Sequence, residues 1–191
     1  MASVGVTIDA DCLYSAPVRD TLLRLAQAGL YRAYWSDGII EEALRNLRLN
    51  GVMTEQQANY LRSALREAFP ESFVTGYRRF IADLTCAPED RHVLAAAIRS
   101  GSRILVTNNV RDYPAVSVAP FEIEVQTPDA FLLRQLDAYP NVVREVLADQ
   151  AAALRNPPLT VAQLLDVLSK LVPAFAGAVR AQFGLANQPQ D

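Results

Sequence analysis

The chain has 191 residues, of which 51% are hydrophobic and 20% charged, and its formal net charge is −3. This length and composition are ordinary for a globular domain, no apolar run is long enough to span a membrane, and the N-terminus lacks a signal-peptide pattern. The acidic balance argues against a passive nucleic-acid binder.

In the first half of the chain, apolar runs typical of strands alternate with capped helical patterns. In chain order the predicted elements are a strand at 4–9, a helix at 17–28, a strand at 31–35, a helix at 37–49 and a helix at 55–68. Ser36 and Thr54 are suitable N-cap residues for the last two helices. Gln57 completes a capping box with Thr54.

The second half continues the alternation and then becomes helical. In chain order we expect a short segment compatible with a strand at 73–77, a helix at 88–100, a buried strand at 103–107, an alternating edge strand at 121–126 and a helix at 128–138. A linker-like break follows at 156–160. Thr160 then caps an amphipathic helix that carries the apolar residues Leu164, Leu165, Leu168 and Leu171.

This alternation of strands and helices predicts an α/β fold, with a central parallel sheet and helices on both faces. We expect a domain that contains the sheet at 1–138, a C-terminal helical extension at 139–184 and a disordered tail at 185–191. The helices of the extension most simply pack back on the domain and enlarge its core. The alternative is that they form an interface with another subunit or a partner protein.

Acidic residues follow the predicted carboxyl ends of two strands. Asp9 and Asp11 follow the first strand, and Asp112 lies in the loop TNNVRDYP after the strand at 103–107. The ends of these strands can be neighbours at the switch point of a parallel sheet, where ligands bind. Packed carboxylates repel one another and need a hard cation, for which Mg²⁺ or Mn²⁺ is suited. Asp and Asn are also ordinary turn formers.

Asp90 is expected on the inward face of its helix. It precedes Leu94 by four residues and Ala97 by seven, so it shares a face with the apolar stripe. An acid in the first helical turn also interacts favourably with the helix dipole, and the residues alone leave both interpretations open. Glu89, rotated by roughly 100°, is the better candidate for that second role.

Periodicity does not choose between Glu41 and Glu42 in the helix at 37–49. They lie on opposite sides of the apolar stripe, each roughly 130° from its centre. Asn46, four residues after Glu42, favours the Glu42 side for a polar site. A solvated helix surface explains either glutamate equally simply.

Missing residue types exclude several enzyme classes. The only lysine, Lys170, is far from every motif, which disfavours a receiver domain and a P-loop nucleotide hydrolase. The only histidine, His92, lies in a helix, so a Ser-His-Asp triad is excluded. An aspartate-nucleophile phosphatase also begins with a strand and Asp-x-Asp. That family, however, carries a hydroxyl residue at the position of Leu13 and a lysine in the active site, and this chain has neither. Because the two cysteines form neither a metal spacing nor a disulfide framework, we expect a reduced, cytoplasmic protein.

Three segments in order make the chain similar to PIN-domain proteins, the fold of the VapC-type toxin ribonucleases. The segments are IDADCLY (8–14), SDGIIEEALRNL (36–47) and PEDRHVLAAAIRSGSRILVTNNVRDYP (88–114). The third is the most specific, because an acid, a HVLAAAI-type helix, a glycine and an LVTNN ending occur together. The resemblance implies a three-layer α/β/α sandwich and a metal-dependent endoribonuclease with an acidic pocket.

The resemblance also assigns roles residue by residue. The acids implied to be catalytic and to bind metal are Asp9, Glu42, Asp90 and Asp112. The fourth acid position is assigned either to Asp112 or to Asn109, because Asn109 stands where many relatives carry an acid. This departure from the family pattern leaves open whether a second metal ion binds. Asp11 takes a position that is often Asn or Ser, so it is expected to be a hydrogen-bonding helper.

The expected reaction is the hydrolysis of RNA phosphodiester bonds by water activated on Mg²⁺ or Mn²⁺. Arg19, Arg91 and Arg111 are candidates for binding substrate phosphates, although surface solubility explains each of them more plainly. We expect RNA as substrate, an antitoxin protein as partner, and a homodimer. The main alternative is a catalytically inactive PIN-like domain that binds nucleic acid or protein.

Overall fold

The computed structural model describes residues 4–154 and 159–185 and contains a four-stranded sheet in the order β2-β1-β3-β4. The strands are β1 (Gly5–Ile8), β2 (Arg32–Tyr34), β3 (Ile104–Val106) and β4 (Glu124–Gln126). Each described pairing of strands is parallel. The predicted α/β class with a central parallel sheet is therefore confirmed, and β4 is an edge strand as its alternation indicated.

The switch point of the sheet lies between β1 and β3. The chain passes from β1 to β2 on one side and then returns to β3 on the other side of β1. The Asp9 N–H donates to the Val106 carbonyl at 3.0 Å, and the Thr107 N–H donates to the Gln126 carbonyl at 3.0 Å. Residues that follow β1 and β3 are thus held next to one another at the carboxyl edge, where α/β sheets bind ligands.

The chain divides into two compact units, which we call the first and second unit. The first unit comprises Met1–Ser15 and Tyr31–Thr127, and the second comprises Ala16–Leu30 and Pro128–Asp191. The predicted domains have different boundaries, with one continuous segment to residue 138. Of the predicted linker and tail, residues 155–158 and 186–191 lie outside the described residues.

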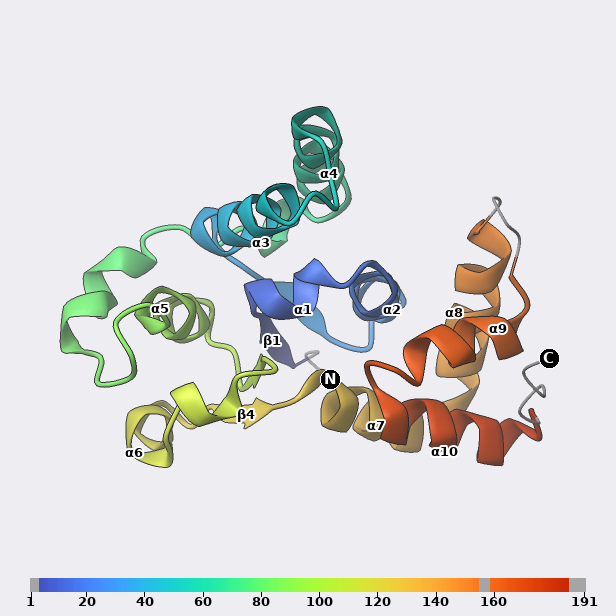
Figure 1. The fold of residues 1–191 in the computed structure, drawn as a ribbon. Coiled ribbons are helices and arrows are strands. Elements are labelled where there is room, and N and C mark those ends of the chain that lie inside the picture. Colours follow the sequence, from blue (N-terminus) through green and yellow to red (C-terminus); the bar gives the residue numbers. More distant parts are fainter. Residues whose placement is uncertain (1–3, 155–158, 186–191) are drawn as a thin grey trace. The chain divides into compact units, whose positions relative to one another are not determined.

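The first unit holds the sheet and its shorter connections. Its helices are α1 (Ala10–Tyr14), α3 (Asp37–Leu49), α4 (Glu55–Ala68), α5 (Arg91–Ser100) and α6 (Ala115–Val118), with 3-10 turns η1 (Pro70–Ser72), η2 (Tyr77–Asp83), η3 (Val110–Asp112) and η4 (Ala119–Phe121). Helix α5 packs on the sheet and beside η2, the two green segments that lie side by side in Figure 1. The N-caps predicted at Ser36 and Thr54 are present, the latter as a full capping box with Gln57.

The segment 73–77 does not form the strand that we considered. It makes only an isolated bridge, in which the Val74 N–H donates to the Trp35 carbonyl at 2.8 Å. Gly76 then adopts a left-handed conformation (φ 71°), which a strand cannot continue through, and η2 follows. The short helix α1 was also not expected, because five residues are too few for a periodic pattern.

The second unit is entirely helical in its described residues. Its helices are α2 (Ala16–Gln27), α7 (Pro128–Ala138), α8 (Pro140–Ala153), α9 (Val161–Leu168) and α10 (Pro173–Phe183). The Thr21 hydroxyl and the Gln150 amide join α2 to α8, and the Asp129 carboxylate accepts bonds from two backbone N–H groups at the start of α10. Leu171, expected on the apolar face of α9, lies beyond that helix and is 46% exposed. Within the described ranges, no helix is long and apolar enough to cross a lipid bilayer.

Candidate active site

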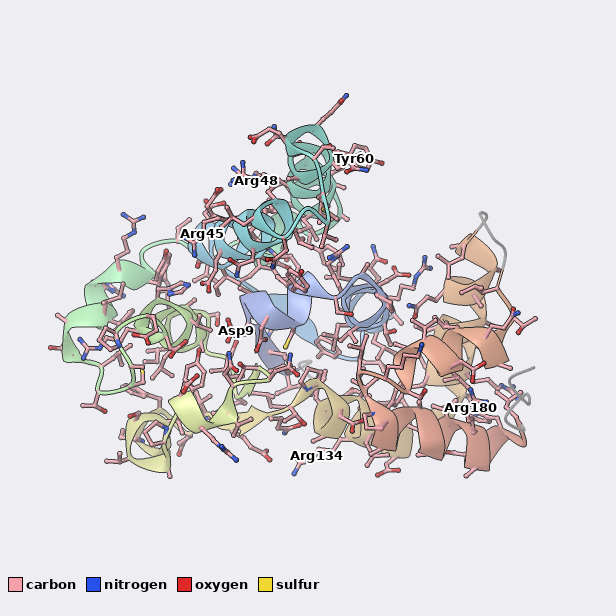
Figure 2. The ribbon with its side chains drawn as sticks, viewed as in Figure 1. Asp9, Arg45, Arg48, Tyr60, Arg134 and Arg180 are labelled. Carbon is pink, nitrogen blue, oxygen red and sulfur yellow. The ribbon has the colours of Figure 1, made fainter. Side chains whose placement is uncertain are left out.

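Asp9 lies where β1 passes into α1, at the switch point of the sheet (Figure 2). Its carboxylate accepts from the Ala10 N–H at 2.6 Å as the N-cap of α1 and from the Tyr113 hydroxyl at 3.3 Å. The side chain is only 6% exposed. Burial, followed by repulsion from Asp11 and a smaller repulsion from Glu42, raises the pKa of Asp9 to about 7.

Asp11 connects the loop after β1 to the loop after β3. Its Oδ2 accepts from the Asn108 N–H at 2.8 Å and from the Thr107 hydroxyl at 3.3 Å. Its Oδ1 accepts from the Cys12 thiol at 3.0 Å. Both carboxylate oxygens of Asp11 are therefore engaged within the protein, and the side chain fixes the two loops against each other.

Asp90 precedes α5 at the N-cap position, but its carboxylate makes no capping hydrogen bond. Partial burial and repulsion from Asp112, Glu89 and Glu42, in that order, raise the pKa of Asp90 to about 6, while His92 lowers it. A helix-start acid with only a dipole role would be expected to ionise more easily, not less. This shift connects Asp90 electrostatically to the other acids and distinguishes it from an ordinary helix-start residue.

His92 contacts this cluster from α5. Its Nδ1 lies 2.8 Å from the Glu89 carbonyl oxygen, and its Nε2 lies 3.3 Å from Glu42 Oε2. Because a carbonyl can only accept, Nδ1 carries a proton and Nε2 is the nitrogen that faces the carboxylate. Glu42 thus points to α5 and belongs with Asp9 and Asp90.

Glu41 is engaged on the other side of α3. Its carboxylate forms ion pairs with Arg62 of α4 and, at 3.6 Å, with Arg48, and its side chain is 50% exposed. Glu42 is 35% exposed and repels both Asp9 and Asp90. The contacts of α3 with α4 and α5 therefore separate the two glutamates, which the periodicity of the sequence left equivalent.

The loop after β3 brings Asp112 toward Asp90. Asp112 is exposed in η3, and its charge is the largest charge effect that raises the pKa of Asp90. Asn109 is also exposed, and its N–H donates to the Thr107 hydroxyl at 3.0 Å. Of the two alternatives for the fourth position, Asp112 is the one that carries charge into the cluster.

The candidate arginines are differently placed. Arg91 donates through Nε to the Cys86 carbonyl at 3.1 Å and is partly buried, while Arg111 is exposed in η3 beside Asp112. Arg19 lies on α2, in the second unit, and is 8% exposed; its burial lowers its pKa. Arg111 is therefore the most accessible of these three side chains.

The acids are electrostatically coupled without forming a closed metal cage. Within residues 4–154 and 159–185, no three His, Cys, Asp or Glu side chains are grouped closely enough to hold a metal ion as they stand. The donor set nevertheless fits a hard divalent cation, because carboxylate oxygens predominate, and burial together with mutual repulsion raises the pKa values of Asp9 and Asp90.

Sequence reasoning missed two residues of this site. Tyr113 is buried with its hydroxyl on Asp9, and His92 was considered only as a member of a catalytic triad. A signal existed for Tyr113, since a tyrosine next to a strand-end turn is buried only with a partner for its hydroxyl. For His92 the signal was its position two residues after Asp90, on the helix that carries that acid.

Known proteins resemble this chain in sequence. The family described as the VapC50 C-terminal domain matches residues 128–181, the segment from the start of α7 into α10. A protein of Mycobacterium tuberculosis named "Putative ribonuclease VapC50" is 39% identical over 112 residues, which is 59% of this chain and 66% of that protein. The match thus spans just under two thirds of the relative's length, and no solved structure matches the chain. Both matches support the resemblance of this chain to VapC-like proteins of the PIN-domain type.

Proposed function

We propose that this protein is a metal-dependent endoribonuclease that hydrolyses phosphodiester bonds of RNA. The observation that carries the proposal is the group of coupled carboxylates at the switch point, where Asp9 and Asp90 have pKa values raised toward neutrality. The relative from Mycobacterium tuberculosis, whose name describes a ribonuclease, supports the same reaction.

Asp9, Glu42 and Asp90 would hold the cation, with Asp112 at the exposed side. Bound there, Mg²⁺ or Mn²⁺ would neutralise the carboxylates and polarise the phosphodiester and an attacking water. Tyr113 fixes Asp9 Oδ2 by its hydroxyl hydrogen bond, and Asp11 holds the two loops that carry the acids. His92 Nε2 orients Glu42 from α5.

Asp112 suits a role beside the reacting water. It is exposed, it lies on a short turn that the Asp112 N–H closes onto the Asn109 carbonyl at 3.0 Å, and its charge reaches Asp90. A carboxylate in that position can accept a hydrogen bond from a water molecule that attacks the phosphorus. The attack would displace one RNA oxygen in line, with the proton of the water passing to the carboxylate.

The family also suggests a biological setting. We propose that the nuclease is the toxin of a toxin–antitoxin pair, that an antitoxin protein silences it by covering the carboxylates, and that it acts in the cytoplasm. Such a partner could place an arginine among the acids, because a guanidinium can bind a carboxylate through two hydrogen bonds. We also propose a homodimer, which sedimentation of the purified chain would test.

The decisive experiment is an RNA cleavage assay with the full chain. Purified protein is incubated with total RNA and with Mg²⁺, Mn²⁺ or EDTA, and the Asp90→Asn variant is compared under the same conditions. Cleavage that needs the metal and is lost in Asp90→Asn supports the proposal. A folded wild-type protein that binds RNA and leaves it intact with either metal would favour the inactive binding domain. A phosphate trapped covalently on Asp9 would favour the phosphatase.

A further inference from the structure

A cavity of about 540 Å³ in the first unit is lined by Arg78, Arg79 and Arg99. We call it the arginine pocket. Arg78 and Arg79 lie on η2, Arg99 lies near the C-terminal end of α5, and all three side chains are exposed. Gly76 completes the wall, because a Cβ on this residue would lie 3.7 Å from Arg99 Nε. The packing of η2 along α5 therefore collects three guanidinium groups around one hollow.

The positive charge of the arginine pocket is not balanced within it. Asp37 is the carboxylate in its lining, and that group forms an ion pair with Arg66 instead. In the described part of the chain, no carboxylate lies within ion-pair distance of the three pocket arginines. Arginine remains charged at any physiological pH. The pocket is thus a local positive site on a chain whose net charge is −3.

The arginine pocket adjoins the carboxylate site through Tyr77. This residue lines the pocket and is buried, and its hydroxyl lies 3.0 Å from where a Cβ on Gly38 would be. The same Cβ would lie 3.4 Å from the ring of His92, whose Nε2 contacts Glu42. Tyr77 and His92 therefore lie between the pocket and Glu42. Along α5, Asp90 and Arg99 are roughly 14 Å apart.

A nuclease whose site is acidic needs cations elsewhere to hold its polyanionic substrate. A guanidinium binds a phosphate through two parallel hydrogen bonds, and a positively charged groove that follows the backbone is typical of single-strand binding. Resting on the function proposed above, we propose that the arginine pocket binds a backbone phosphate of the RNA strand, a few nucleotides from the phosphate at the carboxylates. Recognition there is of the phosphate and so independent of base sequence.

The test measures RNA binding by the full chain. A fluorescein-labelled single-stranded RNA of mixed sequence is titrated with protein in an Asp90→Asn background, with Mg²⁺ and at several salt concentrations. Arg78→Gln with Arg99→Gln should weaken binding about tenfold at low salt. The slope of log K against log salt should fall by about 0.7 for each phosphate that the variant no longer neutralises. Arg78→Lys with Arg99→Lys should give an intermediate affinity, because lysine keeps the charge but not the paired hydrogen bonds.

The matched control is Arg32→Gln with Arg103→Gln. These arginines are also exposed and lie at the amino end of β2 and before β3, outside the lining of the pocket, and Arg103 forms an ion pair with Glu122. This variant removes the same charge and should bind RNA nearly as wild type does. Equal losses in the two double variants would overturn the proposal, because only total charge would then matter.

Two further outcomes separate this proposal from the proposed function. If the wild-type chain cleaves RNA with metal while the Arg78/Arg99 variant binds and cleaves as the control does, only the arginine pocket is wrong. If the wild-type chain neither cleaves nor binds RNA, both proposals fail. Loss of binding to an acidic peptide with RNA binding unchanged would assign the pocket to a protein partner and also overturn it.

Discussion

Replacing Asp9 by Asn should remove a pH-dependent cost that the metal-free protein carries. Burial and neighbouring charge raise the pKa of Asp9 from 3.8 to about 7. At about 1.4 kcal/mol for each tenfold change in the proton equilibrium, ionised Asp9 disfavours the folded state by at most roughly 4 kcal/mol. Because domains of this kind are stable by only about 5–15 kcal/mol, the effect is a large part of the total.

The sign follows from proton binding. Between pH 4 and pH 7, the folded protein holds a proton on Asp9 that the unfolded chain has lost, so the free energy of unfolding falls as the pH rises through this window. Above pH 7 both states are ionised and the loss is complete. Asp90, whose pKa is about 6, acts in the same direction over the lower part of the window.

Asn at position 9 can keep the hydrogen bonds that matter. Its Oδ1 can accept from the Ala10 N–H, and its Nδ2 can donate to the Tyr113 hydroxyl, which is both donor and acceptor. In EDTA, Asp9→Asn should match the wild type only below about pH 4, and its advantage in stability should grow from pH 5 to pH 8. Glu71→Gln, at an exposed acid of η1, is the control and should keep the wild-type profile.

Urea unfolding between pH 5 and pH 8.5 measures the free energy of unfolding of both proteins, with tryptophan fluorescence as the signal. Trp35 is the only tryptophan and is fully buried in the first unit, so it reports on the unit that contains Asp9. Adding Mg²⁺ or Mn²⁺ should stabilise the wild type more at pH 8 than at pH 5, since metal and protons compete for the carboxylates. A metal-free wild type that becomes more stable from pH 5 to pH 8 would refute the reasoning.

Three other outcomes are expected. Glu42→Gln should lower RNA cleavage at least a hundredfold with the fold intact, whereas Glu41→Gln should stay within about threefold of wild type in the same assay; the reverse order would exchange their roles. Tyr113→Phe leaves one oxygen of Asp9 without its donor and should destabilise the first unit by about 1–3 kcal/mol in urea, with little effect if that hydrogen bond is unimportant. A chain ending at Asp137 should precipitate on expression, because α2 and α7 lose the helices that cover their leucines; a soluble, monomeric and active product would assign those helices to an interface.

Much of the fold could be predicted because its determinants are local. The caps at Ser36 and Thr54 and the apolar runs of the strands act within a few residues. Both caps are present, and a strand forms within each predicted strand segment except 73–77. Membership of the two units depends instead on packing between distant segments. Helix α2 joins α8 through Thr21 and Gln150, a pairing of residues 129 positions apart that no local pattern encodes.

The candidate site likewise contains residues that local sequence patterns predict and residues that only tertiary packing identifies. Asp9 and Asp90 could be proposed as site residues from the sequence. A charge beside a buried strand or on an apolar helix face is energetically unfavourable, so an acidic residue there indicates a function. The choice of Glu42 over Glu41 could not, since it depends on Arg62 of α4 on one side and His92 of α5 on the other. The tertiary neighbours of α3 therefore distinguish two glutamates that the periodicity of the sequence does not.

The free energy that the ionised carboxylates cost the folded state also indicates how strongly a cation could be bound there. Asp9 and Asp90 are held in a region that disfavours their charge, although Tyr113 and the Ala10 N–H stabilise Asp9 and His92 lies close to Glu42. A residue selected only for stability at these positions would be apolar or an amide. Because a bound cation would relieve the unfavourable charge, the free energy that the carboxylates cost the fold would contribute to affinity for the ion. The pH dependence of Asp9→Asn and the metal dependence of the wild type therefore probe the same carboxylates. If Asp9→Asn removes the pH dependence but leaves the stabilisation by metal unchanged, Asp9 is not where the metal binds.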